Sequence, residues 1–185
     1  DFFVSKATLD EQILPTPTDQ KILQDSTQYR VVNVATNFMS DATTSYYHQS
    51  MGGYHPAKLS RYQDVISYCI TPNGGQLSAD FITNNNALDM LNCKYVLSKD
   101  QKSGAEEAFP RMNPNGHAWF VSSVSNAETA KKALELVNSV DIKNVAVIES
   151  KELNKPSANS FNKDTNSVIK LSPIFLIEYF FILLF

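Results

Sequence analysis

The run from Tyr29 to Ala35, YRVVNVA, constrains the fold of this chain more than any other stretch. Its β-branched and apolar side chains occupy nearly consecutive positions, which is typical of a strand buried on both faces. Arg30 and Asn33 are its polar interruptions. A strand of this kind needs neighbours on both sides, so we expect it to lie in the centre of a sheet.

Three further runs are predicted to be strands, and they alternate irregularly with helical patterns. These strands are expected at Lys94–Leu97, His117–Val124 and Val145–Glu149. The irregular order, and the lack of any glycine-rich dinucleotide or phosphate-loop pattern, favour α+β over a doubly wound fold. At 185 residues the chain fits a single domain, with a mixed β-sheet and helices packed on it.

Helix starts are predicted from capping patterns and apolar spacing. In TPTDQKILQD, Thr16 can cap the helix, Pro17 suits its first turn, and Asp19 meets unpaired amides there. We expect this helix to reach Asp25. Other helices are expected after Pro56 with apolar residues at the three-four spacing, in ALDMLN capped by Asn86, and over Ala127–Asn138 with a capping box of Ser125 and Glu128. The charged stretch Ser98–Glu107 is predicted to be a surface loop.

Composition divides the chain into an N-terminal extension (1–15), an α+β domain (16–150), a polar linker or loop (151–173) and an apolar tail (174–185). The tail, IFLIEYFFILLF, is shorter than the roughly 20 apolar residues of a membrane-spanning helix. A terminal core strand, a truncated membrane entry and sequence foreign to the parent protein all fit its composition. The start at Asp1, with no basic leader segment, suggests a piece of something longer.

Charge and cysteine content argue against several function classes. The net charge is −3 and no Lys/Arg cluster occurs, which disfavours nucleic acid as a partner. Cys69 and Cys93 form no C-x-x-C pair, so they are predicted to be buried apolar residues rather than zinc ligands or a disulfide. The spacing of His48, His55 and His117 matches no common metal-ligand set, and no metal or other cofactor is expected.

The window from Ser45 to Ile70 is the part of the chain best suited to binding. Gly52 and Gly53 precede a predicted helix, so backbone amides there could face an anion, with Lys58 and Arg61 adding positive charge. Alternatively, the glycines serve only a turn with positive φ.

The aromatic residues of the same window suggest a carbohydrate platform, because aromatic faces stack on sugars while hydroxyls and imidazoles bond their rims. A cluster that closes the edge of the core would give the same pattern. A hydrolase built from Asp41 or Asp64, a histidine and a serine has no nucleophile-elbow pattern to support it. No catalytic residue is predicted. The predicted substrate-binding residues are Tyr46, Tyr47, His48, Gly52, Gly53, Tyr54, His55, Lys58 and Arg61.

Several blocks occur in an order that is similar to a known family. They are TPTDQKILQD with YRVVNVATN, then TSYYHQSMGGYHPAKLSRYQDVI, then ALDMLNCKYVL with NPNGHAWFVSSV. Over about Leu14 to Val147 the chain resembles the extracytoplasmic region near the C-terminus of bacterial YfhO-like membrane proteins. The most specific part is the S-Y-Y-H, G-G-Y-H, K-L and R-Y-Q-D series. The apolar tail departs from the family, whose members continue into a β-rich segment before a last membrane helix.

The resemblance implies a parent that is a multi-pass protein of the bacterial inner membrane and a glycosyltransferase that uses lipid-linked sugars to modify cell-envelope polymers. This chain would lie on the extracytoplasmic face and would be non-catalytic, because the catalytic carboxylate of such enzymes lies on an earlier loop. Its role would be to bind the lipid-linked donor or the envelope glycan acceptor. The alternative is a structural domain that docks on the membrane portion of its own parent and has no ligand of its own.

Overall fold

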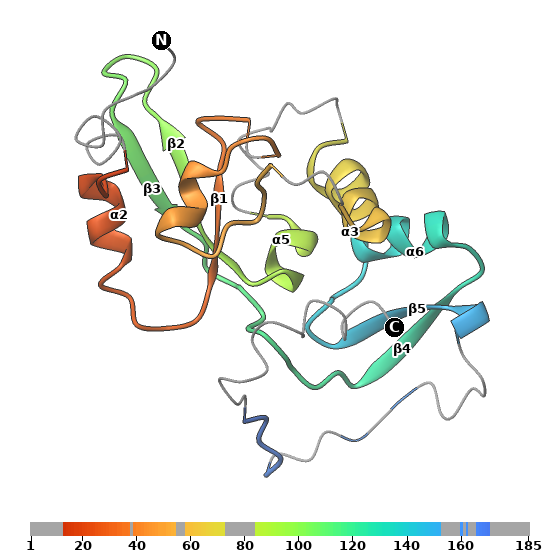
Figure 1. Ribbon diagram of the computed structural model, residues 1–185. Coiled ribbons are helices and arrows are strands. Elements are labelled where there is room, and N and C mark those ends of the chain that lie inside the picture. Colours follow the sequence, from red (N-terminus) through yellow and green to blue (C-terminus); the bar gives the residue numbers. More distant parts are fainter. Residues whose placement is uncertain are drawn as a thin grey trace. The chain divides into compact units, whose positions relative to one another are not determined.

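A computed structural model describes residues 13–37, 39–54, 58–72, 84–152, 160, 162 and 166–170 (Figure 1). The chain forms two compact units. Unit 1 contains residues 1–58 and 92–114, and unit 2 contains residues 59–91 and 115–185. The domain predicted over 16–150 therefore contributes to both units. The apolar tail and most of the polar linker lie outside the described residues.

Unit 1 begins with helix α2, Pro17–Ile22, whose start follows the predicted capping pattern. The Thr16 hydroxyl accepts from the Asp19 backbone N–H at 3.0 Å, and the Asp19 carboxylate accepts from the Thr16 N–H at 2.8 Å. These two bonds satisfy amides that the first helical turn leaves unpaired. The helix ends at Ile22 rather than at the predicted Asp25, and the Ile22 side chain is buried in the core.

The sheet of unit 1 is mixed and has the order β1-β2-β3. Strand β1, Arg30–Asn33, runs parallel to β2, Cys93–Lys99, and β3, Glu106–Pro110, runs antiparallel to β2. This arrangement, with helices packed against strands, confirms the predicted α+β class with a mixed sheet. The expectation that β1 is central is wrong, because β2 takes that position.

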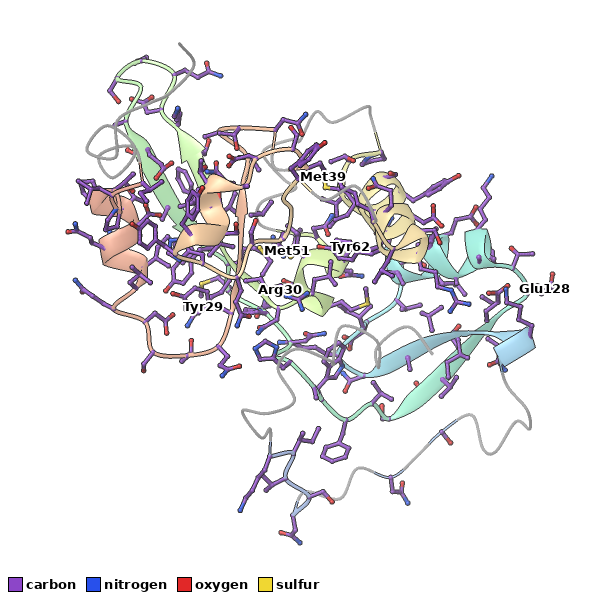
Figure 2. All side chains as sticks on the ribbon, viewed as in Figure 1. Tyr29, Arg30, Met39, Met51, Tyr62 and Glu128 are labelled. Atoms are coloured by element: carbon purple, nitrogen blue, oxygen red, sulfur yellow. The ribbon has the colours of Figure 1, made fainter. Side chains whose placement is uncertain are left out.

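The outer side of β1 is nevertheless occupied. Val31 donates its N–H to the Gln49 carbonyl at 2.9 Å and accepts from the Met51 N–H at 2.8 Å, which makes a parallel bridge to Ser50. Val31, Val32 and Met51 are almost fully buried. The apolar composition of β1 is thus explained by a loop segment, rather than a regular strand, that covers its outer edge. Met51 of this segment lies beside the strand that carries Arg30 in Figure 2.

Strand β3 replaces part of the loop predicted over Ser98–Glu107. Strand β2 extends to Lys99, and a hairpin turn at Asp100–Ala105 returns the chain along it. The Asp100 carboxylate accepts from the Ser103 hydroxyl at 2.7 Å, and Gly104 takes a φ of +68° that favours glycine. The charged residues of the turn are therefore bound into a defined hairpin.

Unit 2 combines helices with a second, two-stranded sheet. Its elements are α3 (Ser60–Val65), the π-helix η2 (Ile66–Ile70), α5 (Asn86–Met90), β4 (Ser123–Ala127), α6 (Ala130–Val137), β5 (Val145–Glu149) and the short 3₁₀ helix η3 (Ser150–Glu152). Strands β4 and β5 are parallel, and α6 connects them and packs on both. The predicted β5 is confirmed at both ends.

Other predicted boundaries in unit 2 are shifted. The third strand begins at Ser123 instead of His117, and Trp119 lies before it, with its indole N–H donating to the Ile142 carbonyl at 3.0 Å. Helix α6 is capped by the Thr129 hydroxyl, so the predicted box of Ser125 and Glu128 is wrong, because Ser125 belongs to β4. Helix α5 is capped by Asn85, one residue before the predicted Asn86.

The helix predicted after Pro56 is confirmed from Ser60, and Val65, Ile66, Cys69 and Ile70 of the predicted apolar face are buried. Leu59, which was predicted on the same face, precedes the helix and is 46% exposed. The second half of the helix is a π-helix, in which the Thr71 N–H donates to the Ile66 carbonyl at 2.7 Å across five residues. None of the described helices has both the length and the hydropathy needed to cross a membrane.

Both cysteines are buried and neither is in a disulfide, as predicted. Burial raises the pKa of the Cys69 thiol to about 11, so this thiol stays protonated near neutral pH.

Candidate functional site

The predicted binding loop is held in unit 1 by a buried hydrogen bond. His48 follows the 3₁₀ helix η1, Thr43–Tyr46, and its Nε2 lies 2.8 Å from Oδ1 of Asp19. The His48 side chain is 1% exposed and that of Asp19 is 13% exposed. Among the described residues, the Nδ1 atom of His48 has no hydrogen-bond partner. His48 therefore faces the protein interior. Its side chain has no exposed atom that could make the predicted contact with a substrate.

The carboxylate of Asp19 joins this loop to the first turn of helix α2, and Thr16 and Thr18 join that turn to β3. Asp19 Oδ2 accepts from the Thr16 N–H and hydroxyl, and Thr16 Oγ1 also lies 3.1 Å from Oε1 of Glu106. The Thr18 hydroxyl donates to the Glu106 carbonyl at 2.8 Å, so α2 lies beside β3 (Figure 1). The Asp19 carboxylate thus takes part in both the capping box and the hydrogen bond with His48.

Tyr47 is also engaged internally, since its hydroxyl donates to the carbonyl of Ile13. The Gly52 N–H donates to the Ser50 hydroxyl at 3.1 Å, so it is not directed at an anion. Gly53 has a φ of +128°, a conformation that side chains rarely adopt, which fits the turn interpretation of the glycine pair. Helix α3 starts only at Ser60, after non-helical Lys58 and Leu59.

Two loop segments of unit 1 lie against each other beyond the C-terminal end of β1. A side chain at Gly53 would meet the Asp41 carbonyl at 3.9 Å. Lys58 donates its Nζ to the Met39 carbonyl at 2.8 Å, and Figure 2 labels Met39 on this loop. Asn33, the last residue of β1, is buried and donates to the Thr44 hydroxyl at 3.2 Å. We call residues 39–46 and 50–54, with Lys58, the paired loops.

Asp41 is the charged centre of the paired loops. Its carboxylate accepts from the N–H and hydroxyl of Thr43, from the Thr36 hydroxyl at 3.1 Å and from the Thr44 hydroxyl at 3.4 Å. Burial raises the pKa of Asp41, but these hydrogen bonds together outweigh burial and leave the pKa below its usual value. Asp41 is therefore an ionised acceptor at neutral pH.

Two aromatic side chains of the paired loops face solvent. Tyr46 is 59% exposed and Tyr54 is 74% exposed. Tyr46 ends η1, two residues after the buried Thr44, and Tyr54 follows Gly53. Exposed aromatic faces beside hydroxyls and a carboxylate are the groups that bind sugars. This is the arrangement in the described structure that is best suited to recognition.

The remaining predicted site residues are not among the described residues of unit 1. Arg61 belongs to α3 in unit 2, and His55 lies outside the described residues. His117 also belongs to unit 2. No group of three or more metal-ligating side chains occurs within the described ranges. His48 bonds to Asp19 rather than to Asp41 or Asp64, so the hydrolase set considered from sequence is not assembled around it.

A second polar cluster in unit 1 is structural. Lys94 donates to Asp25 at 2.5 Å, and Tyr95 donates to the same carboxylate at 2.8 Å. The Tyr29 and Tyr95 rings pack edge to face at 5.0 Å, and Lys94 Nζ lies 5.8 Å from each ring centroid. The hydrogen bond from Lys94, followed by those from Thr27, holds the pKa of Asp25 well below its usual range.

Desolvation and the nearby Asp25 charge raise the pKa values of both tyrosines, that of Tyr95 to about 12. Tyr29 donates its hydroxyl to the Ile22 carbonyl at 2.8 Å, so the cluster fastens the end of α2 to the sheet.

Neither Asp19 nor Asp41 was predicted from sequence as a ligand-binding residue, and Asp41 was considered only for a hydrolase set. Asp19 was recognised for its cap alone, and its contact with His48 spans 29 positions, which no local pattern records. Asp41 did leave a signal, because Asp followed by Thr two residues later is typical of a turn in which the carboxylate binds the following amide.

Comparison of the chain with protein-family models, with curated proteins and with solved structures gives no match.

Proposed function

We propose that this chain is a non-catalytic binding domain, and that the paired loops of unit 1 contact a carbohydrate through Tyr46 and Tyr54. The exposure of these two tyrosines, at 59% and 74%, is the observation that carries the proposal. Each ring can offer a face to a sugar, while the ionised Asp41 and the neighbouring hydroxyls can accept or donate at its rim.

The internal contacts of the paired loops support this role. Tyr47 and His48 make internal hydrogen bonds, so the adjacent Tyr46 stands on a backbone that loses little freedom on binding. The predicted ligand contacts of Tyr47 and His48 thus become positioning contacts. Lys58, tied to Met39 but exposed, can add a charge for a phosphate-linked sugar.

The similarity to YfhO-like proteins leads us to propose the setting. The domain would lie at the extracytoplasmic face of a bacterial inner membrane, as part of a multi-pass glycosyltransferase. Its ligand would be the lipid-linked sugar donor or the envelope glycan acceptor.

Titration of the labelled protein with polyprenyl-phosphate sugars and with envelope glycans, followed by NMR, tests this proposal. We expect shift changes confined to the paired loops. Replacing Tyr46 and Tyr54 together by alanine should weaken binding about tenfold or more, since each aromatic contact contributes about 1 kcal/mol. Tyr68→Ala, which removes a tyrosine of unit 2 that is 52% exposed, is the matched control and should change nothing. A folded protein that responds to neither ligand class would refute the binding role.

A second candidate is a structural domain that docks on the membrane portion of the parent. The buried Asp19–His48 bond favours it, because a loop fixed from within can present a constant surface to another protein segment. In that case the Tyr46 and Tyr54 substitutions would lower the stability of the full-length parent without any effect of sugars on the domain.

A further inference from the structure

The hydrogen-bonding groups of the paired loops distinguish a phosphate-linked sugar from a neutral glycan. A phosphate is negatively charged, and its oxygens only accept hydrogen bonds. A neutral glycan presents hydroxyl groups, which donate as well as accept. A phosphate therefore needs donors or cations on the protein, whereas a neutral glycan can be held by acceptors.

Backbone N–H groups in both paired loops donate to acceptors within the protein. In the second loop, Met51 donates to the Val31 carbonyl at 2.8 Å and Gly52 donates to the Ser50 hydroxyl at 3.1 Å. In the first loop, the N–H groups that donate to neighbouring residues of the chain are those of Met39, Ser40, Asp41, Thr43 and Ser45. A loop that binds an anion directs several N–H groups toward it. The amides of these residues are therefore not a phosphate cradle.

Hydroxyl groups of the first loop are also committed as donors. The Thr43 hydroxyl donates to Asp41 at 2.8 Å, and the hydroxyls of Ser40 and Ser45 donate to backbone carbonyls. A hydroxyl has one proton, so each of these oxygens keeps lone pairs that can accept but has no further proton to donate. Thr43, Ser40 and Ser45 are exposed. Their oxygens thus offer acceptors to a ligand and suit the hydroxyl donors of a sugar.

Thr43 lies on the same side of η1 as Tyr46. Thr43 begins this 3₁₀ helix and Tyr46 ends it. Side chains three residues apart in a 3₁₀ helix lie one above the other. The Thr43 oxygen is therefore next to the exposed Tyr46 ring, where it can accept from a hydroxyl of a sugar stacked on that ring.

The charged side chains of the paired loops, Asp41 and Lys58, offset each other. Lys58 favours a phosphate, but it donates to the Met39 carbonyl at 2.8 Å, two residues before Asp41. The Asp41 carboxylate is ionised at neutral pH. Its negative charge opposes the approach of a phosphate and leaves a neutral sugar unaffected.

We propose that the paired loops bind a neutral glycan rather than a phosphate-linked sugar, an assignment that rests on the proposed function. Sugar rings stack on Tyr46 and Tyr54, and a sugar hydroxyl donates to Oγ1 of Thr43. Thr43 then recognises a hydroxyl of the ligand, and Asp41 disfavours phosphate.

Matched ligand pairs test the proposal. Neutral tetrasaccharides of hexoses and of N-acetylhexosamines, each paired with its reducing-end 1-phosphate, are titrated into the labelled full chain, and the paired-loop amides are followed by NMR. We expect neutral forms to bind about fivefold more tightly than their phosphates, because the phosphate meets the Asp41 charge. Asp41→Asn keeps an acceptor oxygen and removes the charge, so it should reduce this difference to about twofold or less. Lys58→Gln should leave the affinity for the neutral forms unchanged.

A pair of valine variants tests the acceptor role of Thr43. Thr43→Val keeps the shape of the side chain and should weaken binding of the neutral forms about fivefold. Thr36→Val is the matched control, because Thr36 also donates its hydroxyl to Asp41, at 3.1 Å, but lies outside η1. It should change the affinity by less than about twofold. Amide exchange at the buried Val96 reports whether unit 1 is folded in each variant.

The outcomes separate the neutral-glycan assignment from carbohydrate binding itself. Tighter binding of the phosphates, lost in Lys58→Gln, would overturn the assignment and leave carbohydrate binding standing. Equal affinities within the ligand pairs, or equal effects of the two valine substitutions, would also overturn it. If neither form of any ligand shifts the paired-loop amides of the folded protein, both proposals fall. If Thr43→Val does not fold, the ratio of the two affinities in the unmodified chain and in Asp41→Asn decides.

Discussion

Substitution of Asp19 by alanine should destabilise unit 1 far more than an ordinary surface substitution. The change removes the acceptor of three donors, the Thr16 N–H at 2.8 Å, the Thr16 hydroxyl at 2.9 Å and His48 Nε2 at 2.8 Å. Loss of the Asp19 half of the capping box leaves the Thr16 N–H unpaired and costs about 1 kcal/mol, while the Thr16 hydroxyl still caps the helix. Leaving the buried imidazole with neither nitrogen bonded costs about 1–3 kcal/mol. We expect a total of about 3 kcal/mol in the free energy of unfolding.

The assay must report on unit 1 alone. The single tryptophan, Trp119, lies in unit 2, so its fluorescence would follow the other unit. Amide exchange of the β1 and β2 cores, at Val32 and Val96, gives the local unfolding free energy instead. Asp64→Ala, which removes an exposed carboxylate of α3 in unit 2, is the control and should leave these amides unchanged.

A double-mutant cycle sharpens the test. His48→Ala alone should also destabilise, but adding Asp19→Ala to it should cost about 1–2 kcal/mol less than in the native background, because the orphaned imidazole is then absent. Strict additivity of the two substitutions, or a loss below about 0.5 kcal/mol for Asp19→Ala, would refute the role assigned to the pair.

Three further predictions concern titration and reactivity. Because the folded-state pKa of Asp41 is lowered, its stabilising contribution is complete above the unfolded carboxyl pKa and is lost as pH falls through the folded value. Asp41→Asn should therefore reduce the loss of unit 1 stability below about pH 4, as measured by amide exchange. The raised pKa of Tyr95, about 12, means that its contribution is complete below about pH 10 and is lost as pH rises through 12, and Asp25→Asn should lower this pKa, as read from phenolate absorbance. Cys69 and Cys93 should resist thiol reagents at pH 8 in the folded protein and react fully in urea, and fast labelling of Cys69 when folded would contradict its burial.

The elements that could be predicted from sequence are those with local causes. The Thr16 cap of α2 needs only neighbouring residues, and the run VAVIE forms β5 through its own side-chain pattern. The apolar face of the helix after Pro56 also follows from spacing alone, since Val65 and Ile66 are buried as expected. In these places local propensity and tertiary packing favour the same structure.

The misses have non-local causes. Strand β3, EEAFP, has weak strand propensity and forms because β2 offers an edge and the Asp100 turn returns the chain to it. The composition of the Ser45–Ile70 window suggested exposed imidazoles. His48 is instead buried and forms a hydrogen bond with Asp19, which lies 29 positions earlier in the sequence. Tyr46 and Tyr54 remain exposed, and nothing in the letters SYYH distinguishes Tyr46 from the internally bonded Tyr47.

The π-helix η2 has a consequence for comparing this chain with others. Its wide turn, closed by the Thr71 N–H and hydroxyl on the Ile66 carbonyl, contains one residue more than an α-helical turn. A homologue shorter by one residue between Ile66 and Ile70 could close an ordinary turn there and still bury side chains equivalent to Val65 and Ile66. A one-residue gap at this place in an alignment would therefore mark a change of helix type and not a loss of the fold.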